Sequence, residues 1–349
     1  MLVFTTGALL LLFSQKSDPK SLFSAGVLFG IATLFKVPAA FELPVIIVFW
    51  FTTHQGGLAK KSVYLFMGFL APILLTLIWF LAQGALPDYI RAAFLQNVGY
   101  LSTFRPGDIQ KPFLVKNAPL LIRAAVVALG VGIIWLKRKK FTREFMFATI
   151  WLLFALFAVT LSERPYPHYL LQAVPALSLL VAILVKGETI DQVLTIIPIG
   201  ILLFVPFFFK FYNYSTTGYY TRFIGFATGQ MTKNAYMNSF DKNTAGNYKL
   251  ADFLVKSSGP EERIFVWGDS PVIYALTRRL PATKFVAAYH IADFSTKAET
   301  VKTLNQSKPS YVVILDGSPA FNEIKPFLAS SYVLISSEPK EEIWRLWQK

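Results

Sequence analysis

The sequence contains no cysteine and few charged residues. Without cysteine, the chain has neither disulfides nor thiolate metal ligands. Charged residues make up 15% of the 349 residues, whereas hydrophobic residues make up 54% and the mean hydropathy is +0.49. This composition is too apolar for an ordinary soluble domain and predicts a membrane protein.

The common motifs of nucleotide binding and hydrolysis are also missing from the sequence. It has no GxGxxG or GxxxxGK loop, no HExxH or GxSxG pattern, and no cluster of carboxylates suited to a metal ion. VWGDS at 266–270 has the strand, glycine and helix-start order that can bind an anion, but helix capping is the better interpretation. The residues therefore indicate no cofactor, and a divalent-metal requirement stays open.

Much of the positive charge lies in short loops beside apolar stretches. Lys60-Lys61 and the run Lys137-Arg138-Lys139-Lys140 are the clearest examples. Such juxtamembrane clusters orient helices and contact anionic lipid headgroups. Membrane lipid is therefore an expected partner, and nucleic acid is the weaker interpretation of the net charge of +14.

Eight predominantly apolar stretches occupy the first 209 residues. A helix that crosses the membrane perpendicularly needs roughly 20 apolar residues. The eight stretches lie at about 1–13, 21–35, 38–53, 62–82, 117–136, 144–161, 168–185 and 190–209. The basic loops at 14–20, 54–61, 137–143 and 186–189 all fall on one side, which the positive-inside rule makes cytoplasmic. We therefore predict an α-helical polytopic membrane bundle of about eight segments over 1–209.

The remaining residues, 210–349, have the pattern of a small α/β domain. An amphipathic helix is predicted at 246–258, and buried strands are predicted at 263–268 and 310–317. Successive apolar segments cross the membrane in alternating directions from the cytoplasmic loops. This alternation places the domain outside the cytoplasm, together with a long external loop at about 84–116.

Three cationic or titratable residues fall on the same external side: Lys36 after an apolar run, and Arg164 and His168 in SERPYPHYL at 162–170. Together they predict an anion site, because guanidinium and ammonium groups match a phosphate. Each residue has a simpler alternative. Lys36 can reach the headgroups on its own, Glu163 can neutralise Arg164, and His168 can cap the next helix.

Aromatic and polar residues near these cations extend the candidate site. Tyr169 follows His168 at the start of a proline-bearing helix. In the external loop, Asn97, Tyr100 and Arg105 are candidates for contacting a polar substrate, and residues 88–101 have the spacing of an amphipathic helix on the membrane surface. A structural role at the interface is the alternative for the three loop residues.

The order of these motifs resembles a known family. GVLFGIATLFKVPAA, RPYPHYLLQAVPALSLL and VWGDSPVIYALTRRLPAT together resemble bacterial multi-pass glycosyltransferases of the protein mannosyltransferase and aminoarabinose transferase superfamily. The resemblance implies transfer of a sugar from a polyprenyl phosphate to a glycan, lipid or protein acceptor outside the plasma membrane. It also implies that Lys36 lies near the carrier phosphate, with Arg164 and His168 in a second external motif.

One expected feature of that family is missing before Met1. Its members carry a catalytic acid in a first external loop, and the first apolar stretch here, MLVFTTGALLLLF, is short for a span. We therefore expect the acidic base upstream of Met1, in a longer gene product. Two other functions remain open: a transporter or flippase of a lipid-linked anion, and a non-catalytic fragment or subunit that binds the carrier lipid.

Overall fold

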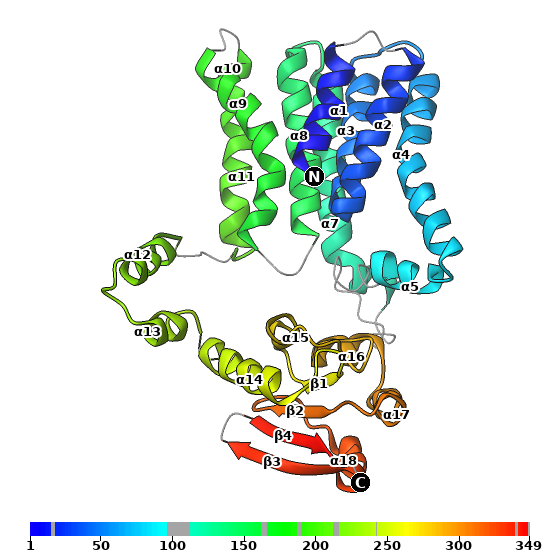
Figure 1. The fold of residues 1–349 in the computed structure, drawn as a ribbon. Coiled ribbons are helices and arrows are strands. Elements are labelled where there is room, and N and C mark those ends of the chain that lie inside the picture. Colours follow the sequence, from blue (N-terminus) through cyan, green and yellow to red (C-terminus); the bar gives the residue numbers. More distant parts are fainter. Residues whose placement is uncertain are drawn as a thin grey trace. The chain divides into compact units, whose positions relative to one another are not determined.

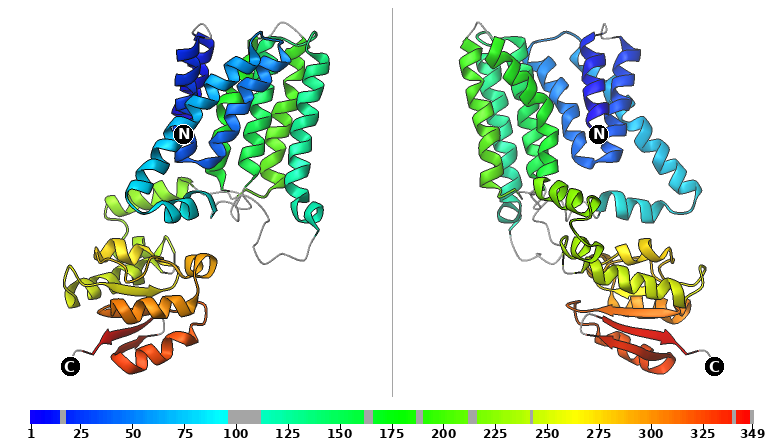
Figure 2. Two further views of the ribbon diagram at one scale, coloured as in Figure 1. Left: turned by 90° about the vertical axis from the view of Figure 1, so that its right-hand side faces the viewer. Right: turned by 60° about the vertical axis from the view of Figure 1, so that its left-hand side comes forward.

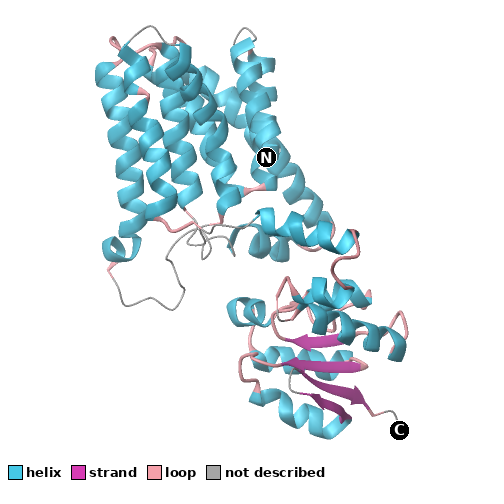
Figure 3. Cartoon of the chain, turned by 90° about the vertical axis from the view of Figure 1, so that its left-hand side faces the viewer, coloured by secondary structure: helices cyan, strands magenta, loops and turns pink. Residues whose placement is uncertain are grey.

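A computed structural model describes residues 1–14, 18–95, 112–161, 166–186, 190–211, 216–241, 243–338 and 341–347. The chain divides into two compact units, Met1–Asn213 and Tyr214–Lys349. Figure 1 shows that the described part of the first unit is helical, and Figure 3 shows that the strands belong to the second. The sequence placed the domain boundary at 209/210.

The first unit is a bundle of helices that lie side by side in the views of Figures 1 and 2. Its described elements are α1 (Leu2–Ser14), α2 (Pro19–Phe35), η1 (Val37–Glu42), α3 (Leu43–Thr52), α4 (Leu58–Ala82), α5 (Leu86–Ile90), the π-helical η2 (Arg91–Leu95), α7 (Phe113–Lys137), α8 (Arg143–Thr160), η3 (Pro167–Ala173), α9 (Val174–Lys186), α10 (Ile190–Leu194) and α11 (Ile196–Phe208).

Among the described residues, five helical stretches are long and apolar enough to cross a membrane. They are Leu58–Ala82, Asn117–Lys137, Arg143–Thr160, Pro167–Lys186 and Ile190–Phe208. Three further apolar helices, Leu2–Phe13, Pro19–Phe35 and Val37–Thr52, are shorter. The helical bundle is therefore confirmed in outline, whereas the number of eight spans stays a prediction.

The surface of the bundle is apolar, as a lipid-facing surface must be. Of the most apolar window of α4, only 11% is buried within the structure, and for α7 the share is 6%. Exposed side chains such as Trp79 and Leu129 would form an unfavourable patch in water. In contrast, 67% of the α8 window is buried, so α8 forms the centre of the bundle.

Helices α2 and α4 approach each other closely through glycine. A Cβ atom on Gly26 would overlap the carbonyl oxygen of Leu65, and one on Gly68 would overlap that of Phe23. Gly30, one turn after Gly26, meets α4 in the same way. Small residues of this kind let helix backbones pack tightly where lipid offers no hydrophobic driving force.

The second unit contains a mixed sheet in the order β1-β2-β4-β3. Its strands are β1 (Ile264–Trp267), β2 (Tyr311–Leu315), β3 (Tyr332–Glu338) and β4 (Glu341–Leu346). β1 and β2 are parallel, and the other two pairings are antiparallel. The edge strand β3 has a register shift between Leu334 and Ser336. The strands predicted at 263–268 and 310–317 are confirmed as β1 and β2.

Helices cover both faces of this sheet. The described helices are α12 (Thr216–Ala227), α13 (Lys233–Asn238), α14 (Thr244–Ser257), α15 (Val272–Thr277), α16 (Ala288–Phe294), α17 (Lys297–Ser307), η4 (Asn322–Ile324) and α18 (Lys325–Ser331). One core joins α14 and α15 to the sheet, and another joins α16, α17 and α18 to the opposite face. The helix predicted at 246–258 is confirmed as α14.

Candidate functional site

The candidate site begins at a break between two helices of the first unit. Lys36 has an extended backbone, and its N–H still bonds to the carbonyl of Ala32, so it closes α2. Pro38 then opens η1, where its ring suits the first turn of a new helix but cannot continue the old one. The break leaves the half-buried Lys36 side chain at the joint between α2 and η1.

The Lys36 ammonium lies against the aromatic residues at the start of η3. Its Nζ is 3.9 Å from the centre of the Tyr169 ring, which is a cation–π contact. The Tyr169 ring is in turn 4.5 Å from the ring of the exposed His168, at an edge-to-face angle. The structure thus brings Lys36, His168 and Tyr169 together from two distant parts of the sequence.

A hydrogen bond holds the same two segments together. The side-chain Nε2 of Gln172, in η3, donates to the carbonyl oxygen of Pro38, in η1, at 3.2 Å. Gln172 follows Tyr169 by one turn of a 3₁₀ helix, in which side chains three residues apart stand on the same face. η3 therefore presents both Tyr169 and Gln172 to η1.

Lys36 has no acidic partner within the described ranges of the chain. It forms a cation–π contact but no ion pair there. An ammonium group that rests on an aromatic ring keeps its other N–H donors available. The arrangement leaves N–H donors of Lys36 for an anion, and the binding of an anion there stays a prediction.

Several predicted site residues lie outside the described residues. These are Asn97, Tyr100 and Arg105 of the external loop, and Arg164, together with its neighbour Glu163. Their grouping with Lys36 stays a prediction. The amphipathic helix expected at 88–101 is described only as far as α5 and η2.

Arg123 is a further cation that the sequence analysis passed over. It lies in α7, and its guanidinium donates from Nη1 to the carbonyl oxygen of Thr160 at the end of α8. It also lies 5.1 Å from the centre of the Phe209 ring. A charged residue in a membrane-capable helix indicates function by default. Its signal was visible in the sequence, because Arg123 is the sole charge in the apolar run 117–136.

Glu42 is the second overlooked residue. It is completely buried at the end of η1, where Trp151 of α8 donates from Nε1 to its Oε2 at 3.2 Å. The sequence signal was again a single ionisable group, here within the apolar stretch 38–53. The chain thus places an acid inside the bundle close to the segments that carry Lys36 and Tyr169.

Metal ligands are not grouped in the part of the chain that the structure describes. No three His, Asp or Glu side chains lie there in positions that could hold a metal ion. The structure therefore assigns no residue to the divalent metal that the sequence left open.

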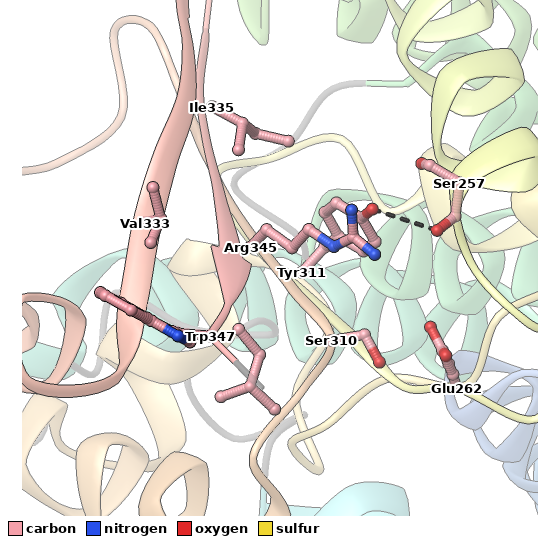
Figure 4. Close-up of a pocket in the computed structure, with 9 residues that line it drawn as sticks. Ser257, Glu262, Ser310, Tyr311, Val333, Ile335, Arg345 and Trp347 are labelled. Atoms are coloured by element: carbon pink, nitrogen blue, oxygen red, sulfur yellow. Dashed lines mark hydrogen bonds between the residues drawn. The ribbon is translucent and has the colours of Figure 1, made fainter. Parts of the chain in front are cut away.

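The second unit has a groove of its own, which Figure 4 shows. It has a volume of about 640 Å³ and is lined by Ser257, Glu262, Ser310, Tyr311, Val333, Ile335, Arg345, Leu346 and Trp347. The Tyr311 hydroxyl donates to the carbonyl oxygen of Ser257 at 3.1 Å, and the Arg345 guanidinium lies 5.9 Å from the Tyr311 ring centre. The groove mixes apolar and charged groups, and contains none of the predicted site residues.

These observations define a mostly helical protein whose described part contains five membrane-capable helices and a small C-terminal sheet domain. Residues 245–343 match the family model described as "Putative competence-induced protein Ccs4 C-terminal domain". A search of curated proteins found no match. The matched residues run from α14 into β4, so the likeness concerns the second unit.

Proposed function

We propose that this protein is a membrane glycosyltransferase that moves a sugar from a polyprenyl-phosphate carrier to an acceptor outside the cytoplasm. The observation that supports the proposal best is the contact of Lys36 with Tyr169, with His168 at the same place. A cation that has no acidic partner among the described residues, at the end of apolar helices, suits the phosphate head of a lipid whose tail lies between helices or in the bilayer. A soluble phosphate would need no such surroundings.

In the proposed reaction, the bond between the sugar's anomeric carbon and the phosphate oxygen breaks, and its electron pair stays on the phosphate. Lys36 and Arg164 would stabilise the charge that develops there, as preorganised cations do in other transfer reactions. The acceptor hydroxyl attacks from the opposite face and gives its proton to a base, as inverting sugar chemistry requires. Within the described residues, we assign no side chain to that role.

The charge distribution supports the orientation that this reaction needs. Lys60, Lys61 and the run at 137–140 belong to the loops that the positive-inside rule places in the cytoplasm. The joint at Lys36 and the start of η3 then face outward. We accordingly propose a bacterial plasma-membrane protein with an extracytoplasmic C-terminal domain, acting on a glycan, lipid or protein.

Carrier binding provides the first test. The protein, in lipid nanodiscs, is titrated with a long-chain polyprenyl phosphate and, separately, with the uncharged polyprenol of the same length. We expect Lys36→Ala to weaken phosphate binding by about tenfold and to leave polyprenol binding unchanged. Lys140→Ala, in a predicted cytoplasmic loop, is the matched control. Equal phosphate binding by the wild type and Lys36→Ala would contradict the anion site.

A transfer assay separates the proposed enzyme from the alternatives. The protein is incubated with a labelled polyprenyl-phosphate sugar and envelope glycans, and release of label from the carrier is measured. Transfer that Lys36→Ala reduces supports the glycosyltransferase. Carrier binding without any transfer would instead favour a flippase or a non-catalytic subunit.

A further inference from the structure

The buried polar group around Glu42 is not used by the proposed reaction. Glu42, Gln172 and Thr5 are 0%, 1% and 0% exposed, and the last two lie beside the Glu42 carboxyl. Trp151, 4% exposed, donates to Oε2. The group joins η1, η3, α1 and α8 at one point inside the bundle. An ionised carboxylate in such a place would be very unfavourable unless a cation or several donors compensated it.

Compensation of that kind is incomplete within the described chain. Glu42 forms no ion pair there, and its Oε1 has no hydrogen-bond partner. The Oε1 of Gln172 is buried and also lacks a partner. The Thr5 hydroxyl donates to the carbonyl of Leu2, and one of the two N–H groups of the Gln172 amide donates to Pro38.

One proton resolves both unsatisfied oxygens. A protonated Glu42 carboxyl gains an O–H donor at Oε1, and the Gln172 side chain, which lies beside the carboxyl, has an Oε1 acceptor in need of a donor. Oε2 keeps its hydrogen bond from Trp151. An unsatisfied buried acceptor costs about 1–3 kcal/mol. A single proton shared between the Oε1 atoms of Glu42 and Gln172 removes this cost for both.

We propose that Glu42 is a protonated carboxylic acid that donates a hydrogen bond to Gln172 and so positions Lys36 against Tyr169. η1 has Lys36 at its beginning and Glu42 at its end, and η3 carries His168, Tyr169 and Gln172. The Glu42–Gln172 bond adds to the Gln172–Pro38 bond and fixes one 3₁₀ segment against the other. Glu42 is a positioning residue, and this role rests on the proposed function.

Infrared spectroscopy tests the protonation directly. The spectrum of the protein in nanodiscs at neutral pH is compared with that of Glu42→Gln. We expect the wild type to show the C=O band of a protonated carboxyl and Glu42→Gln to lose it. Glu144→Gln, at an exposed position in the first turn of α8, is the control and should keep the band. Absence of the band from the wild type would overturn the proposal.

A second variant tests the partner. Gln172→Leu removes the acceptor, so the carboxyl band should move to higher frequency as the O–H loses its hydrogen bond. A band that stays in place would show that Gln172 does not accept the proton. This measurement does not depend on carrier binding.

Carrier binding then tests the positioning role. Glu42→Gln keeps the side-chain shape and offers an amide N–H to Gln172, so its affinity for polyprenyl phosphate should stay within about twofold of the wild type. Glu42→Ala should lower that affinity by about tenfold, because it leaves the Gln172 Oε1 and the Trp151 Nε1 without partners. Equal losses in Glu42→Gln and Glu42→Ala would contradict the positioning role.

The two proposals fail in different ways. A wild type that shows the carboxyl band but binds no polyprenyl phosphate overturns the proposed function and the positioning role, while the protonated Glu42 stands. A wild type that binds the carrier but shows no band overturns the inference on Glu42 and leaves the proposed function intact.

Discussion

The Nζ of Lys36 rests 3.9 Å from the centre of the Tyr169 ring, and so a residue at the end of α2 contacts one at the start of η3. α2 is followed by η1, which has Pro38 in its first turn, and η3 begins at Pro167. The cation and its ring are therefore held by two short 3₁₀ segments rather than by the long helices.

Replacement of the Tyr169 ring should weaken carrier binding. A cation–π contact contributes about 0.5–2 kcal/mol and orients the ammonium. We expect Tyr169→Leu to reduce polyprenyl-phosphate affinity severalfold and Tyr169→Phe, which keeps the ring, to retain more of it. Titration in nanodiscs measures both. Equal affinity of the two variants would show that the ring does not orient Lys36.

A side chain at Gly68 should force α2 and α4 apart. The Cβ of Gly68→Ala would overlap the Phe23 carbonyl oxygen, and the backbone cannot give way as a side-chain end would. We expect a loss of about 1–3 kcal/mol, seen as a lower thermal midpoint in detergent. Gly132→Ala in α7 is the control, because nothing lies within 4 Å of its added Cβ. Similar midpoints would contradict the close packing.

Arg279 should be essential to the stability of the second unit. This buried guanidinium donates to the carbonyls of Ser258 and Thr277 and to the Ser258 hydroxyl, and so connects the end of α14 to the chain after α15. Arg279→Lys cannot make the same forked contacts, so we expect a loss of about 2 kcal/mol. Proteolysis of the full protein should then release fragments from this unit sooner.

The adjacent Arg278 provides the control for Arg279. It is exposed and has a left-handed backbone with φ of +54°, which favours glycine. Arg278→Gly should therefore leave the rate of proteolysis unchanged or lower it. Faster cleavage of Arg278→Gly than of Arg279→Lys would contradict this assignment.

Asp241 should stabilise the start of α14 in a pH-dependent way. The backbone N–H of Asn243, together with the Thr244 side chain and N–H, bonds to its carboxylate and holds the pKa of Asp241 below its ordinary value. A lowered folded-state pKa means that the stabilisation is present above the ordinary aspartate pKa of about 3.9. It is lost as the pH falls through the folded value.

Hydrogen exchange in the first turn of α14 checks this prediction. At neutral pH, Asp241→Ala should exchange faster there than the wild type. The difference should shrink as the pH is lowered below about 4, because the wild-type carboxylate becomes protonated. A difference that does not change with pH would show that the charge of Asp241 is not involved.

Hydropathy predicted the helices well because the length of an apolar run can be counted directly. The strands β1 and β2 were also predictable, since both faces of β1 and the first residues of β2 are buried and their sequences are therefore continuously apolar. EEIWRLW was harder, because its pattern fits either a strand or a short helix. Pairing with β2 and β3 settles it as β4.

The candidate site was predictable only as single residues. Lys36 and His168 stood out as ionisable groups beside apolar runs, but the contact of Lys36 with Tyr169 depends on how η1 and η3 pack. Glu42 and Arg123 were equally isolated charges within apolar runs. They passed unnoticed because they lie inside predicted helices, where their partners Trp151 and Thr160 cannot be found from spacing.

The irregular edge strand of the sheet in the second unit limits strand pairing between copies of this domain. β3 ends the sheet with exposed Val333, Leu334 and Ile335, a composition that would otherwise recruit a strand from another copy. The shift between Leu334 and Ser336 bends that edge and breaks its ladder of free backbone groups. The domain can therefore expose apolar residues on its edge strand at high local concentration without its copies pairing edge to edge into a continuous sheet.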